Sequence, residues 1–202
     1  MSQAQAFPPD SLAPWAEIVP NVPPMTDDDL LALPDDEWQY ELVEGRLVRM
    51  PPSGRRATRM GRRLAARLGD FVDLHGLGEV SGADGGYRLA PGTDLAPDVG
   101  YVRAERLPPL DSPDSDKLIP GAPDLAVEIA SPNQFRPGMG AKARRYLDAG
   151  TRLVWVVWPS RHEVDVWQPG DTQPSATLNT ADTLDGLAVV PGFTLPVADL
   201  FG

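Results

Sequence analysis

The clearest hydrophobic pattern in the chain lies in residues 56–74, where apolar side chains recur every three or four positions. Met60, Leu64, Leu68 and Phe71 share this spacing. Such a period places them on one face of a helix, and the glycines that follow the segment predict where the helix ends. The pattern therefore predicts a long amphipathic helix over residues 56–74.

A different pattern marks residues 124–130 and 152–158, which are almost continuously apolar. Short runs of this kind are typical of central strands that are covered on both faces. Residues 141–149 lie between them and predict a helix that ends at Gly150. Together the three segments predict a strand–helix–strand unit in the second half of the chain.

Shorter elements complete the predicted domain. Thr26 can cap a short helix that has three aspartates in its first turn, and residues 40–50 read as a hairpin that turns at Glu44-Gly45. The pattern also predicts strands over residues 79–89 (interrupted by glycines), 98–103, 163–167 and 187–190, loops over 107–123, 131–140 and 171–181, and a helical turn over 197–201. The sum is a mixed α/β domain over residues 25–202.

The first 24 residues contain six prolines and little periodicity, which predicts a flexible or extended leader. The 202 residues and 42% hydrophobic content fit one soluble globular domain, and no apolar run approaches the ~20 residues of a membrane span. No secretory signal is visible. The chain has no cysteine and only two histidines, which argues against disulfides, thiolate or histidine metal sites and a Ser-His-Asp triad. We therefore expect a cytoplasmic protein with no membrane partner.

Charge is unevenly distributed along the sequence. The formal net charge is −11, which opposes nucleic-acid binding through a broad basic surface. Residues 55–69 nevertheless contain six arginines and no acidic residue. One interpretation is a surface that faces phosphates, with Arg59 and Arg63 as candidate substrate contacts. The other is an ordinary solvated helix face, and the sequence favours neither.

Two carboxylates stand in apolar stretches. Glu128 lies between Val127 and Ile129 in a predicted central strand, where a carboxylate is costly unless it is paired or binds a cation. Asp98 begins another predicted strand, and its alternative role is to accept backbone hydrogen bonds at a loop-to-strand junction. Lys142 follows in the predicted helix, where a lone lysine would ordinarily be a surface residue. Two carboxylates on one face would suit Mg²⁺, which takes oxygen ligands.

Several short motifs occur in a defined order along residues 25–202. They are Glu41-Leu-Val-Glu-Gly45, Met50-Pro-Pro-Ser-Gly54, Ala96-Pro-Asp-Val99, Pro123-Asp-Leu-Ala-Val-Glu-Ile-Ala-Ser-Pro132, Lys142 with Tyr146, Ala149-Gly150, Leu153-Val-Trp-Val156 and Pro191-Gly-Phe193. In this order they resemble the Uma2 family, also called DUF820, of endonuclease-like proteins with a PD-(D/E)XK restriction-endonuclease-like fold. The resemblance implies a central mixed β-sheet flanked by helices.

The resemblance also implies a catalytic site formed by Glu41, Asp98, Glu128 and Lys142. Asp98 and Glu128 are the implied metal ligands, with Mg²⁺ as the cofactor and Mn²⁺ able to substitute. In most PD-(D/E)XK enzymes the lysine lies two residues after the acid on the same strand, but that position here is Ala130. The lysine role is therefore expected to have moved to Lys142 in the following helix.

Two further positions are assigned through the same motifs, and one departs from them. Glu41 is preferred to Glu44 as the accessory acid, because Glu44 lies in the predicted turn. Tyr146 lies one helical turn after Lys142 and is a candidate substrate contact. Family members often have a histidine near the start of the long helix, where this chain has Ala57.

The combined interpretation is a metal-dependent endonuclease that hydrolyses phosphodiester bonds in DNA. A homodimer is also considered, because many restriction-type nucleases dimerise to cut two strands. The alternative from another class is a non-catalytic nucleic-acid-binding or protein-interaction module that retains the nuclease fold. The acidic surface, the displaced lysine and the missing histidine favour that alternative to some extent. Action on RNA or on a small nucleotide is a third reading that the sequence leaves open.

Overall fold

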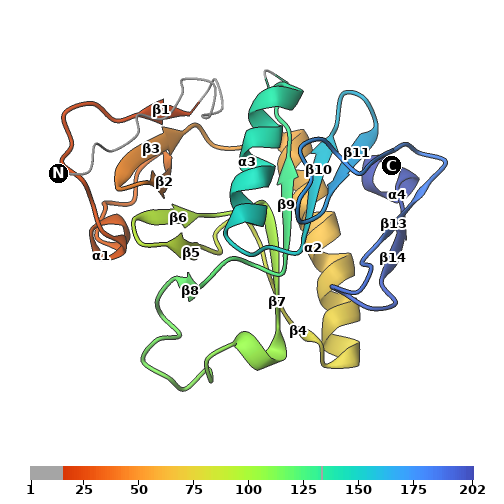
Figure 1. Cartoon of the computed structure of the whole chain (residues 1–202), viewed down its shortest axis with the longest axis horizontal. Helices are drawn as coiled ribbons and strands as arrows, with labels where there is room; N and C mark the ends of the chain where they lie inside the picture. Colours follow the sequence, from red (N-terminus) through yellow and green to blue (C-terminus); the bar gives the residue numbers. More distant parts are fainter. Residues whose placement is uncertain (1–15, 133) are drawn as a thin grey trace.

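Two six-stranded sheets and one two-stranded sheet, with four α-helices, form the part of the chain that the structure describes (Figure 1). The computed structural model describes residues 16–132 and 134–202. The elements are β1 (Glu17–Ile18), α1 (Asp27–Leu31), β2 (Gln39–Val43), β3 (Arg46–Met50), α2 (Arg55–His75), β4 (Gly78–Ser81), β5 (Tyr87–Ala90), β6 (Thr93–Leu95), β7 (Val99–Arg103), η2 (Ala104–Arg106), β8 (Ile119–Pro120), β9 (Leu125–Ile129), α3 (Arg136–Asp148), β10 (Leu153–Trp158), β11 (Glu163–Trp167), β12 (Ala176–Leu178), β13 (Thr183–Asp185), β14 (Thr194–Pro196) and α4 (Ala198–Phe201). The prediction of a mixed α/β fold is confirmed.

The larger core is built on the sheet with strand order β12-β11-β10-β9-β7-β4. Strands β9 and β10 are parallel and are joined through α3, as predicted for the strand–helix–strand unit. Leu125, Val127 and Ile129 of β9 pack in the same core cluster as α2, whereas Ala126 and Ala130 pack with α3. Strand β9 is therefore covered on both faces, and its alternate residues face two different helices.

The long helix α2 agrees with its predicted range to within one residue at each end. Met60, Leu64, Leu68 and Val72 are buried against the sheet, and Gly76 ends the helix in the left-handed region with φ 61°. No helix in the described residues is both long and apolar enough to cross a membrane.

The second six-stranded sheet has the order β1-β3-β2-β6-β5-β8 and lies beside α3 (Figure 1). The β2–β3 hairpin turns at Glu44 (φ 51°) and Gly45 (φ 74°), as the sequence predicted. The leader predicted over residues 1–24 falls in large part on residues 1–15, which lie outside the described residues. In its described part, Glu17 and Ile18 pair with β3.

The short helix α1 begins at the predicted cap. Thr26 and Asp29 form a reciprocal capping box, in which each side chain accepts a hydrogen bond from the other residue's backbone N–H. Asp27 also forms an ion pair with Arg88 of β5. The first turn of α1 is therefore bonded to the neighbouring sheet.

Several predicted element boundaries are wrong. The segment 79–89 is not one interrupted strand, because β4 and β5 belong to different sheets and the chain crosses between them at residues 82–86. The predicted strand at 187–190 is a turn, with Leu187 at φ 51°, and the nearby strand is β13. The predicted loops at 107–123 and 171–181 contain the short strands β8 and β12.

The most consequential correction concerns α3, which begins at Arg136 and not at residue 141. Pro137 is tolerated in the first turn, where its missing N–H has no helical partner. Gly138 and Gly140 are buried, and a Cβ on Gly140 would lie 3.0 Å from the ring of Trp167. The glycines that suggested a loop permit close packing of a helix instead, so Lys142 lies in the interior of α3.

Candidate active site

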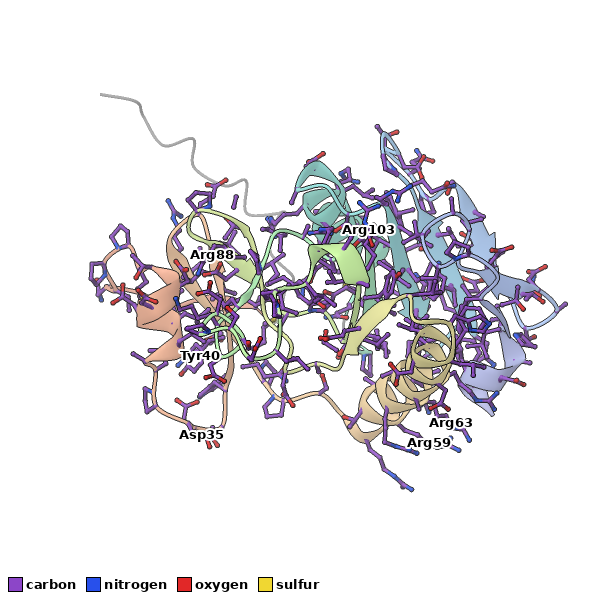
Figure 2. The ribbon with its side chains drawn as sticks, turned by 90° about the horizontal axis from the view of Figure 1, so that it is seen from below. Asp35, Tyr40, Arg59, Arg63, Arg88 and Arg103 are labelled. Carbon is purple, nitrogen blue, oxygen red and sulfur yellow. The ribbon has the colours of Figure 1, made fainter. Side chains whose placement is uncertain are left out.

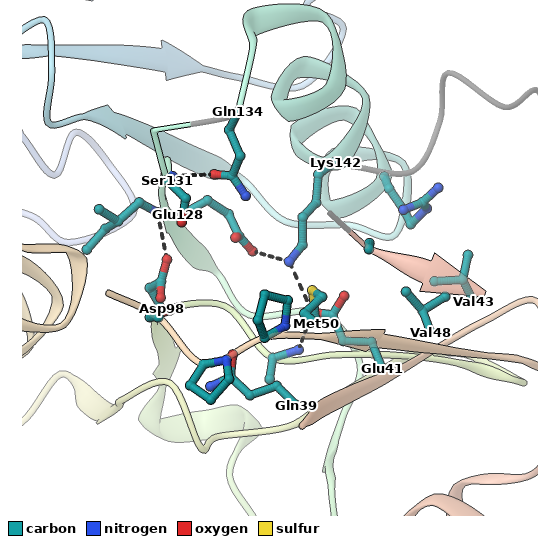
Figure 3. A pocket seen from close by; sticks show the side chains of 17 residues that line it. Gln39, Glu41, Val43, Val48, Met50, Asp98, Glu128, Ser131, Gln134 and Lys142 are labelled. Carbon is teal, nitrogen blue, oxygen red and sulfur yellow. Dashed lines mark hydrogen bonds and ion pairs between the residues drawn. The ribbon is translucent and has the colours of Figure 1, made fainter. Parts of the chain in front are cut away.

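The four residues predicted to form the site line one cavity of about 170 Å³ (Figure 3). Glu41 lies on β2, Asp98 immediately precedes β7, Glu128 lies on β9 and Lys142 lies on α3. The cavity thus collects side chains from both large sheets and from the helix that joins β9 to β10. Residues as far apart as 41 and 142 meet here.

Glu128 occupies the face of β9 that is turned towards α3. Its neighbours on that face are Ala126 and Ala130, whose small side chains leave room for a carboxylate under the helix. Its exposed fraction is only 6%, and burial raises its pKa to about 7, although Lys142 acts in the opposite direction. The prediction that this acid needs a compensating partner is therefore met by a specific cation.

Lys142 bridges two of the acids. Its Nζ lies 3.0 Å from Glu128 Oε1 and 3.0 Å from Glu41 Oε1. Burial acts to lower the pKa of Lys142, but the two carboxylates outweigh it and the net effect is a raised pKa. Lys142 is therefore held in the charged form. Glu41 Oε1 also accepts a hydrogen bond of 3.2 Å from the Ala96 backbone N–H, which orients this acid.

Asp98 connects the start of β7 to β9. Its Oδ2 accepts a hydrogen bond of 2.7 Å from the Ile129 backbone N–H. Burial raises the pKa of the Asp98 carboxyl, and this hydrogen bond and Lys142 oppose the shift. The predicted backbone hydrogen bond of Asp98 is thus present and the side chain also lines the cavity, while its role as a metal ligand stays a prediction.

Tyr146 lies one turn beyond Lys142 and is fully buried. Its hydroxyl donates a hydrogen bond of 2.9 Å to Glu128 Oε1. Burial, together with the negative charge of Glu128, raises the pKa of the Tyr146 phenol well above its ordinary value. The structure places this predicted substrate contact behind Glu128, where it positions the carboxylate.

Arg59 and Arg63 do not line the acid cavity. Both lie on the outer face of α2 (Figure 2). Arg59 lines a separate hollow with His162 and Phe201, and Arg63 donates to the backbone carbonyl of Gly202 at the end of the chain. These two positions therefore have different environments, and neither contacts the acids.

Sequence reasoning gave no site role to four polar residues of the cavity wall, which are Gln39, Ser53, Ser131 and Gln134. Gln134 Oε1 accepts a hydrogen bond of 2.7 Å from the Ser131 backbone N–H and orders the loop that follows β9. Arg145, which the sequence offered as a phosphate contact or a solvated residue, also lines the cavity, three residues after Lys142 on the same helical face. The loop residues carry no comparable signal in the sequence.

The residues present fit a hard divalent cation. In the described residues, Asp98 Oδ1 and Glu128 Oε2 have no hydrogen-bond partner, and both side chains line the cavity. Mg²⁺ is commonly held by one or two carboxylates together with water. No cluster of three or more acidic or histidine side chains that could hold a metal occurs in residues 16–132 and 134–202. A cation would therefore be held by this pair, while Glu41 is bonded to Lys142.

Comparison with known proteins agrees with this fold. The family model Uma2, described as "Putative restriction endonuclease", matches residues 27–198. The chain is also similar to a crystal structure of a putative nuclease belonging to DUF820 from Anabaena variabilis ATCC 29413, with a TM-score of 0.74 and 20% identity over 88% of this chain and 98% of that chain. No curated protein matches the sequence. The chain belongs to the Uma2 family, as its ordered motifs predicted.

Proposed function

We propose that this protein is a metal-dependent endonuclease that hydrolyses phosphodiester bonds in DNA. The observation that carries the proposal is the bridge from Lys142 Nζ to Glu41 and Glu128, in a cavity that Asp98 also lines. The three carboxylates outnumber the two cations of the cavity wall, Lys142 and Arg145. An excess of buried negative charge favours a bound divalent cation.

Each residue has a distinct part in the proposed chemistry. Asp98 and Glu128, which both line the cavity, would hold Mg²⁺, with Mn²⁺ able to replace it. When bound there, such a metal would supply Lewis-acid stabilisation of the phosphoryl oxygens and would lower the pKa of water. Lys142, charged and held between Glu41 and Glu128, stabilises the negative charge that develops on the phosphate. Tyr146 keeps Glu128 oriented from behind.

The proposal is tested by incubating the purified protein with plasmid DNA and either Mg²⁺ or Mn²⁺. We expect Glu128→Gln and Lys142→Gln to lower the cleavage rate at least about 100-fold, which is typical when a preorganised charge is removed. The chain has one other lysine, Lys117, which is exposed and pairs with Asp114. Lys117→Gln is therefore the matched control, and equal cleavage by all the variants would refute the assignment.

A second candidate function is a non-catalytic module that keeps the nuclease fold. One observation favours it, because the Lys142 bridge already compensates Glu41 and Glu128 without any metal. Such a module would leave DNA intact under every metal condition. The same plasmid assay therefore separates the two candidates.

A further inference from the structure

Four of the six arginines of α2 show two different kinds of surroundings. Arg63 donates a hydrogen bond to the backbone carbonyl of Gly202, so it links α2 to the residue that follows α4. Arg55, Arg56 and Arg59 are exposed, and none of them has an ion-pair partner among the described residues. The first two turns of α2 therefore present three arginines that the fold itself does not use.

These three arginines lie on a surface that leads to the acid cavity. Arg55 and Arg56 line a hollow of about 580 Å³ together with Arg59 and His162. The same two arginines line a second hollow of about 310 Å³ that includes Ser131. Ser131 in turn lines the cavity that holds Asp98 and Glu128. The hollow of Arg55 and Arg56 is therefore adjacent to the acid cavity, with Ser131 on the border between them.

We propose that Arg55, Arg56 and Arg59 form a track that binds the phosphate backbone of DNA and leads it to the acid cavity. The choice of DNA as the polyanion rests on the proposed function. Charge supports the track, because residues 55–69 are free of acids in a chain with a net charge of −11. A lipid surface is disfavoured, since none of the exposed large apolar side chains lies on this stretch of α2.

The experiment compares two triple variants of the whole protein. The track variant is Arg55→Gln, Arg56→Gln, Arg59→Gln, and the control variant is Arg46→Gln, Arg67→Gln, Arg152→Gln. The control positions are also exposed arginines without an ion-pair partner in the described part of the chain, and they line neither hollow of the track. Each variant removes three positive charges, so net charge is matched.

Binding is measured by fluorescence anisotropy with a short labelled DNA duplex in EDTA, so that cleavage does not interfere. Titrations run from about 50 to about 200 mM salt, where each phosphate contact contributes about 0.9 to the slope of log K against log salt. We expect the DNA affinity of the track variant to be lower by about tenfold or more at low salt. The magnitude of the slope of log K against log salt should decrease by about 2 to 3. The control variant is expected to match the wild type.

Several outcomes would overturn the track. These are equal weakening of both variants, unchanged binding by the track variant, no binding by the wild type, or binding to phosphatidylserine vesicles in place of DNA. The cleavage assay distinguishes a failure of the track from a failure of the proposed nuclease function. If the wild type binds through the track and never cleaves DNA, the nuclease proposal fails and the track stands. If Glu128→Gln abolishes cleavage while the track variant binds DNA normally, the nuclease proposal stands and the track fails.

Discussion

Glu128 in β9 and Asp94 in β6 are both buried carboxylates, but their surroundings differ. Glu128 has an exposed fraction of 6% and receives both the Lys142 ammonium and the Tyr146 hydroxyl. Asp94 has an exposed fraction of 1%, and neither of its oxygens has a hydrogen-bond partner in the described residues. Glu128 lines the acid cavity, whereas Asp94 does not.

The residue opposite Asp94 explains why it has no partner. Arg88 is its cross-strand neighbour in the β5–β6 pair, but the Arg88 guanidinium forms its ion pair with Asp27 of α1. Burial raises the pKa of Asp94 to about 6, and the charge of Asp27 adds to the shift, while Arg88 opposes it. Burial of an acid therefore does not by itself identify a site. Glu128 is the stronger candidate for a site residue because a cation, a hydrogen-bond donor and a cavity converge on it.

The largest effect on stability is expected when the Lys142 ammonium, which compensates the charge of Glu128, is removed. Lys142→Met leaves Glu128 and Glu41 buried without their shared cation, so the free energy of unfolding should fall by about 3 kcal/mol. Urea denaturation at neutral pH measures this change.

The double variant Lys142→Met, Glu128→Gln provides the control for that prediction. It should recover a substantial part of the loss, because a neutral amide no longer needs the ammonium. A loss below about 1 kcal/mol in the single variant would mean that the bridge contributes little, in line with the weak net worth of many exposed ion pairs.

A smaller effect is expected from Tyr146→Phe, which removes the hydrogen bond to Glu128 and leaves the ring packing intact. A hydrogen bond to a charged group is typically worth about 1.5 kcal/mol or more, so unfolding free energy should fall by about that amount. Cleavage should weaken and yet persist, since the phenol does not face the cavity. Complete loss of cleavage with unchanged stability would give Tyr146 a direct chemical role instead.

The smallest effect is expected at Asp94, and it has the opposite sign. Because the folded-state pKa of about 6 lies above the ordinary value of 3.8, the folded protein binds a proton before the unfolded chain does. Wild-type stability should therefore rise as pH falls from about 7 to about 4. Asp94→Asn should raise the free energy of unfolding by about 1 kcal/mol at neutral pH, and the gain should vanish near pH 4. A gain that did not change with pH would show that ionisation is not its cause.

The sequence predicted those parts of the fold that have strong local periodicity. The buried face of α2 and the apolar strands β9 and β10 are examples, and the ordered motifs brought Glu41, Asp98, Glu128 and Lys142 into one proposed site. The start of α3 was missed because Gly138 and Gly140 suggest a loop locally, and only the tertiary contact with Trp167 explains a helix there.

Asp94 shows what the sequence could not predict about buried acids and their partners. Its exposed fraction is even smaller than that of Glu128, yet it lies beside Thr93 in a short strand that gives no sign of burial in the sequence. Its lack of a partner depends on which acid Arg88 contacts, and that contact joins α1 to β5. Contacts between elements that are far apart in the sequence decide which buried acid has a cation as its partner. The hydrophobic period along the chain carries no information about those contacts.

Isothermal titration calorimetry with Mn²⁺ at neutral pH tests the central claim most directly. The wild type should bind the metal, Asp98→Asn should bind it at least about tenfold more weakly, and Asp94→Asn should bind it as the wild type does. The last variant is a matched control, because it neutralises a buried aspartate outside the acid cavity. No metal binding by the wild type, or equal binding by all three proteins, would contradict a metal site at Asp98 and Glu128.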